Sequence, residues 1–93
     1  MARVNVSQNH NKSDDDVRKI VNALADDLKR RYGINPNWQS DNLVSFKRRG
    51  VTGQLKISPC RVTIDLDVGF LLSAYSGKIK TELTMMMAKN LAD

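Results

Sequence analysis

The chain has 93 residues, of which 41 % are hydrophobic, so it can build the core of one small domain and is too short for a multidomain enzyme. Its 15 Lys and Arg residues outnumber 10 Asp and Glu residues, and the resulting net charge of +5 favours anionic partners without requiring them. The longest apolar run falls far short of the roughly 20 residues of a membrane span, and no signal-peptide pattern opens the chain. The single cysteine cannot form an internal disulfide. We therefore expect one cytoplasmic domain over residues 1–93.

The segment between Ser13 and Gly33 predicts an amphipathic helix. Ser13 is suited to cap the first amides, and Asp16 stands three residues later, as in a capping box. Gly33 fits the left-handed position after the last turn, and Pro36 prevents the helix from continuing. The face expected to pack on the core consists of apolar residues spaced by three and four: Val17, Ile20, Val21, Leu24, Leu28 and Tyr32.

Residues 37–68 alternate between apolar and polar side chains, which is typical of strands with one buried face. Arg49-Gly50 and Pro59-Cys60 are expected to be the loop residues of two tight hairpins. Because the other face is polar, we expect an antiparallel sheet that helices cover on one side only. Counting outwards from the two loops predicts these inward pairs: Val44 with Leu55, Phe46 with Gly53, Leu55 with Ile64, and Gly53 with Leu66.

Two weaker strands are predicted, at residues 3–7 with Val4 and Val6 inward, and around Trp38. Residues 8–12 have the composition of a polar linker. The fold class is therefore α+β: an antiparallel meander of four or five strands with two helices packed on one face, in the order (β)-α-β-β-β-β-α.

The C-terminal segment predicts a helical turn at residues 69–73 and a long helix at about residues 76–91. Three adjacent methionines, residues 85–87, cover about 200° of a helix, so at least one of them must point away from the core. The apolar stripe of this segment consists of Leu72, Tyr75, Ile79, Leu83, Met86 and Leu91.

Catalysis requires a nucleophile, a base or a metal set that can converge, and the chain offers one histidine, one cysteine and no carboxylate pair on an apolar face. His10 lies in the predicted linker, where we expect a solvated side chain. Cys60 lies in a predicted turn, where we expect an ordinary free thiol. Metal-ligand spacings and phosphate-binding glycine motifs are missing. We therefore expect no enzymatic activity, no catalytic residue, no cofactor and no metal.

Two groups of residues are candidates for binding a partner. One is basic and either is solvated surface or contacts phosphates, an anionic surface or an acidic protein. The other is apolar and either forms a corner of the core, the interpretation we favour, or exposes a patch to a partner. The basic group lies near the two hairpin ends and consists of Lys47, Arg48, Arg49, Lys56 and Arg61; the apolar group consists of Phe70, Leu71 and Leu72.

The open face of the predicted sheet carries no aromatic side chain. Sheet-based readers of single-stranded RNA stack bases on aromatic residues of such a face. We therefore do not expect nucleic acid to be the partner, although contacts between the basic loops and phosphates alone stay possible.

Several short motifs taken together indicate a family. They are Arg48-Arg49-Gly50-Val51-Thr52-Gly53, Gly69-Phe70-Leu71-Leu72 and Gly77-Lys78-Ile79, after a helix ending in Tyr32-Gly33. With them, nearly the whole chain from Ser13 onwards resembles the small polyhydroxyalkanoic acid system proteins of bacteria. The resemblance implies a link to polyhydroxyalkanoate granules and brings no catalytic residue.

The preferred hypothesis is a non-enzymatic binding protein that associates with granules or regulates them. Its implied partner is the surface of a storage granule or a protein that coats it, contacted through residues 70–72 and the basic hairpins. Two alternatives stay open. One is a small basic nucleic-acid-binding module, and the other is a domain that binds a small apolar ligand between the sheet and the C-terminal helix.

Overall fold

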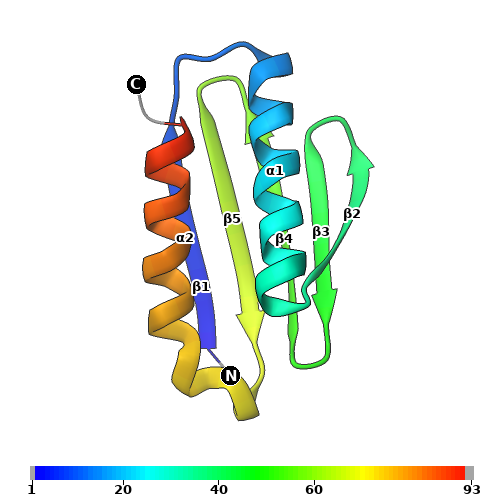
Figure 1. Cartoon of the computed structure of the whole chain (residues 1–93), viewed down its shortest axis with the longest axis vertical. Helices are drawn as coiled ribbons and strands as arrows, with labels where there is room; N and C mark the ends of the chain where they lie inside the picture. The colour runs from blue at the N-terminus through cyan, green and yellow to red at the C-terminus, as the bar shows by residue number, and fades with distance from the viewer. Residues whose placement is uncertain (1, 92–93) are drawn as a thin grey trace.

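The computed structural model describes residues 2–91, which form a five-stranded antiparallel sheet with two α-helices on one face (Figure 1). The predicted α+β fold and its element order are confirmed. The strands are β1 (Ala2–Asn9), β2 (Asn35–Ser40), β3 (Leu43–Arg48), β4 (Val51–Ser58) and β5 (Arg61–Val68). The helices are α1 (Asp14–Tyr32) and α2 (Ser76–Leu91), and the 3₁₀ helix η1 (Phe70–Tyr75) leads into α2.

Strands β2 to β5 form the predicted meander, and β1 joins its far edge beside β5, giving the order β1-β5-β4-β3-β2. Gly50, in the β3–β4 turn, has a φ of 86°, which suits glycine in a tight hairpin. All four inward pairs are confirmed: Val44 with Leu55, Phe46 with Gly53, Leu55 with Ile64, and Gly53 with Leu66.

Helix α1 has the predicted ends. The Ser13 hydroxyl accepts a hydrogen bond from the amide of Asp16. Gly33 has a φ of 68°, its amide donates to the Lys29 carbonyl, and the amide of Ile34 donates to the Leu28 carbonyl. The bond from Gly33 to Lys29 spans five residues, as in the αL motif that ends many helices, and the chain then turns directly into β2.

Strand β1 is longer than predicted and shortens the linker. Gln8 and Asn9 pair with Val62 and Arg61 of β5, so the first two residues of the expected 8–12 linker belong to the strand. The expectation of a solvated His10 is wrong, since this side chain is only 4 % exposed. The His10 amide donates a hydrogen bond to the Cys60 carbonyl. This bond holds the start of the segment between β1 and α1 against the β4–β5 turn, where the His10 ring is buried.

The core lies between the sheet and the two helices, and α2 supplies a slightly different stripe from the predicted one. Met87 is buried with 1 % exposure, whereas Met86 is only partly buried and Met85 is exposed. Tyr75, expected on the stripe, is 59 % exposed because it belongs to η1 and precedes the first turn of α2. One of the three methionines points outward, as predicted.

Within residues 2–91, no helix combines the length and the hydropathy that a membrane crossing requires.

Candidate functional site

The β3–β4 turn and η1 meet at one end of the sheet, which is the lower end in Figure 1. The amide of Gly69 donates to the carbonyl of Gly50 at 2.6 Å and ties the two segments together. A side chain at position 50 would come within 3.2 Å of Leu72, so glycine also allows this close approach. The two candidate groups found in the sequence are therefore partly joined in space.

The apolar group is exposed rather than buried, and the favoured interpretation of a core corner is wrong for two of its three members. Phe70 is 81 % exposed and Leu71 is 85 % exposed, while Leu72 packs partly against the core. Successive residues of a 3₁₀ helix are spread by a third of a turn, so only one of three neighbours can face inward. We call Phe70, Leu71 and the exposed Tyr75 the end patch.

The five basic residues separate into two groups. Lys47, Arg48 and Arg49 lie at the end that carries the end patch. Lys56 and Arg61 flank the β4–β5 turn at the opposite end of the sheet, where the Nε of Arg61 donates to the Asn9 Oδ1 at 3.1 Å. They therefore do not form one continuous basic surface.

Arg48 is held in place by the backbone around it. Its Nη1 donates to the carbonyl of Tyr32 at the end of α1, and its Nε donates to the carbonyl of Arg49 at 3.2 Å. An arginine side chain has five N–H groups, so three remain for another acceptor. Among the described residues no acidic side chain forms an ion pair with Arg48.

A small pocket of about 180 Å³ lies behind the end patch, between the end of α1, the start of α2 and the sheet. We call it the end pocket. Arg48 and Lys78 are exposed members of its wall, and no acidic residue lines it. The rest of the lining is formed by buried aliphatic side chains and by partly exposed tyrosine and leucine: Tyr32, Ile34, Val51, Leu72, Tyr75 and Ile79.

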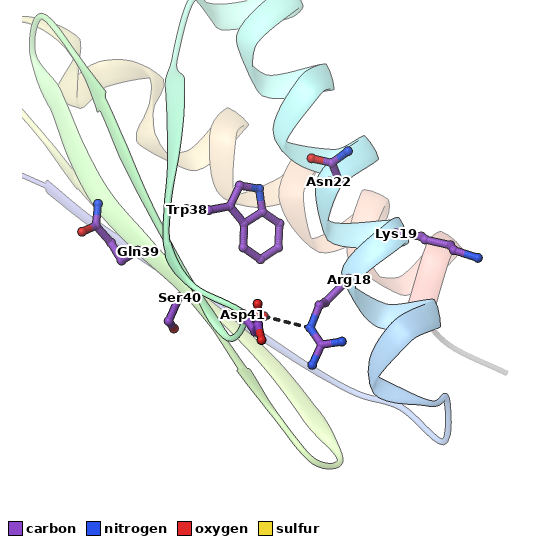
Figure 2. A pocket seen from close by; sticks show the side chains of 7 residues that line it. All are labelled: Arg18, Lys19, Asn22, Trp38, Gln39, Ser40 and Asp41. Carbon is purple, nitrogen blue, oxygen red and sulfur yellow. Dashed lines mark hydrogen bonds between the residues drawn. The ribbon is translucent and has the colours of Figure 1, made fainter.

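A wider and more open groove of about 540 Å³ lies between α1 and β2. Figure 2 shows the indole of Trp38 directed from β2 into this groove, with Asn22 and Arg18 of α1 across from it. Arg18 closes one end by donating through Nε to the carbonyl of Asp41 at 3.1 Å, and it also pairs with the Asp15 carboxylate at 2.8 Å. Its charge is thus already balanced by the protein.

The open face of the sheet is polar, and among the described residues it carries no aromatic side chain. Asp65 and Asp67 lie on this face next to Arg3, at 3.2 Å and 3.6 Å from its Nε. A phosphate backbone would meet these carboxylates there, so the face does not favour nucleic acid.

The histidine and the cysteine of the chain lie beside each other at the β4–β5 turn, where both line an open hollow of about 390 Å³ together with Arg61. Cys60 is an exposed free thiol, and His10 Nδ1 accepts from the Lys12 amide at 3.2 Å while Nε2 has no partner. Residues 2–91 contain no group of three His, Cys, Asp or Glu side chains placed to hold a metal ion.

Of the residues that line the end pocket, only Arg48 and Leu72 are identified from the sequence as candidates for binding a partner. The sequence predicts Tyr32, Tyr75 and Ile79 on core stripes, and Lys78 has no signal beyond the Gly77-Lys78-Ile79 motif. A pocket where helices and two strands meet has no local sequence pattern, since its walls come from distant segments of the chain.

A family model described as "Putative polyhydroxyalkanoic acid system protein" matches residues 4–91. No curated protein matches the chain, and no solved structure matches it.

Proposed function

Because the chain belongs to the family of polyhydroxyalkanoic acid system proteins, we propose that it is a non-enzymatic protein that binds the surface of a polyhydroxyalkanoate storage granule. The observation that carries the proposal is the end patch, where Phe70 and Leu71 are more than four-fifths exposed on a short helix fixed to the sheet. Isolated apolar side chains on a surface are common, but neighbouring large ones on one projecting segment are typical of a contact site.

Contact with a polyester would remove apolar area from water. Full burial of a side chain such as Phe70 or Leu71 contributes about 1.5–3 kcal/mol. Arg48 and Arg49 lie at the same end of the sheet and would be attracted to anionic groups on a coated surface. The patch would supply most of the affinity, and the arginines would add a salt-dependent part.

Co-sedimentation with isolated granules tests this proposal. We expect the protein to sediment with granules, and a Phe70→Ser, Leu71→Ser double variant to lose most of this binding while remaining folded. Met85→Ser is the matched control, because Met85 is also an exposed apolar residue, at 66 %, but lies on α2 outside the patch. Sedimentation no greater than that of a neutral control protein, or equal losses in the patch and control variants, would contradict the proposal.

Particles of pure polyester separate direct attachment from attachment through a coat protein. Binding to these particles at raised salt supports direct contact, since apolar burial is not screened by ions. Binding only to granules that keep their coat proteins would show that a coat protein is the partner and would contradict direct attachment.

A further inference from the structure

The end pocket combines an apolar interior with unpaired positive charge. Ile34, Val51 and Ile79 are buried residues that line it, so its interior suits a hydrocarbon group. Arg48 and Lys78 line it as cations, and no carboxylate of the protein lies among its walls. An uncharged apolar ligand would leave these two cations without an anionic partner.

We propose that the end pocket binds a short aliphatic carboxylate, with the alkyl chain inside and the carboxylate between Arg48 and Lys78. The guanidinium of Arg48 is oriented by the carbonyls of Tyr32 and Arg49 and keeps three free N–H groups, and a planar guanidinium matches a carboxylate in two parallel hydrogen bonds. Lys78 forms no ion pair or hydrogen bond within residues 2–91 and adds a second charge.

The volume of the pocket limits the part of a ligand that it can enclose. A cavity of about 150 Å³ accommodates a six-carbon ring such as benzene, so about 180 Å³ encloses on the order of four to six carbon atoms next to the carboxylate. A free hydroxyalkanoic acid and the carboxyl end of a polyester chain share this chemistry. The choice of these two sources rests on the proposed function, whereas the carboxylate class rests on the pocket alone.

The two tyrosines of the chain provide a specific readout. Tyr32 and Tyr75 are the only tyrosines, and both line the end pocket, so in protein labelled with ¹³C in the tyrosine and tryptophan rings the tyrosine signals report this site alone. The indole of Trp38 lies in the separate groove of Figure 2 and serves as an internal reference. We expect butyrate and hexanoate to shift the tyrosine signals in a saturable way and to leave the Trp38 signal unchanged.

Neutral analogues and a matched pair of variants test the role of charge. Methyl butyrate should bind at least tenfold more weakly than butyrate, which corresponds to about 1.4 kcal/mol. Lys78→Gln should weaken butyrate binding at least fivefold. Lys80→Gln should not, because Lys80 is an exposed lysine of the same helix that does not line the pocket. Absence of saturable shifts at tens of millimolar, equal binding of acid and ester, or equal effects of the two variants would overturn the proposal.

Short hydroxybutyrate oligomers distinguish the two sources. Binding of an oligomer with a free carboxyl end, but not of one capped as its methyl ester, supports recognition of polymer ends, and binding of the monomer alone supports recognition of the free acid. The Phe70→Ser, Leu71→Ser variant should retain carboxylate binding. If the protein binds carboxylates but does not sediment with granules, the proposed function is wrong and this inference stands. If the protein sediments with granules but does not bind carboxylates, this inference is wrong and the proposed function stands.

Discussion

Phe46 on β3 lies directly opposite Gly53 on β4, and Gly53 in turn lies opposite Leu66 on β5. The missing side chain at Gly53 leaves space that its neighbours use: a Cβ there would lie 2.6 Å from Cδ2 of Leu66 and 2.2 Å from the carbonyl oxygen of Asp65. The middle of the sheet is thus packed around a glycine, with large side chains on either side of it.

Removing the Phe46 ring should greatly destabilise the domain. Phe46 is 2 % exposed, and replacing a buried phenylalanine with alanine costs about 3–5 kcal/mol, a large share of the stability of a small domain. Urea unfolding of Phe46→Ala measures the loss, and Phe46→Leu, which keeps most of the apolar volume, should lose clearly less. A loss below about 1 kcal/mol in the alanine variant would argue against the packing described.

Adding a methyl group should have opposite effects at two glycines. Gly53→Ala should destabilise by about 1–3 kcal/mol or more, because backbone atoms occupy the space of the new Cβ. Gly77→Ala meets nothing within 4 Å in α2 and should stabilise the helix by up to about 1 kcal/mol. Thermal melts of both variants provide the comparison, and a neutral Gly53→Ala would contradict the close approach of β4 and β5.

The adjacent methionines should differ sharply in their effect on stability. Met87→Ala should cost about 2–5 kcal/mol because this side chain is buried. Met85→Ala should stay within about 0.5 kcal/mol of the unmodified protein because Met85 is 66 % exposed. Equal losses in chemical unfolding would show that α2 is rotated relative to the sheet.

Binding of DNA or RNA should be weak, independent of sequence and lost by roughly physiological salt. The basic residues occupy opposite ends of the sheet, and Asp65 and Asp67 lie on its open face, so the described residues offer no continuous track for a phosphate backbone. Fluorescence anisotropy of a labelled oligonucleotide over a salt series measures this. Tight binding that survives physiological salt and disappears in an Arg48→Ala, Arg49→Ala variant would restore the nucleic-acid hypothesis.

Local chemistry allowed much of the fold to be predicted. The cap at Ser13, the left-handed Gly33 and the register that pairs Phe46 with Gly53 all follow from short segments, because helix ends and two-residue turns are determined by neighbouring residues. The period-two pattern then separated the polar face from the apolar face without knowledge of any distant contact. The sequence by itself thus determined the elements, the register of β3, β4 and β5, and the sheet face that the helices cover.

Tertiary structure alone decided which side chains outside the sheet are buried or exposed and which residues line the end pocket. His10 has a polar neighbourhood in the sequence, yet it is buried, because its backbone is tied to the β4–β5 turn. Phe70 and Leu71 are as apolar as core residues, but η1 is too short and too tightly wound to turn them inward. Arg48 and Lys78 are 30 positions apart and line one pocket because Arg48 of β3 and the first turn of α2 both lie beside the end of α1. Such convergence depends on contacts between distant segments, which leave no periodic signal in the chain.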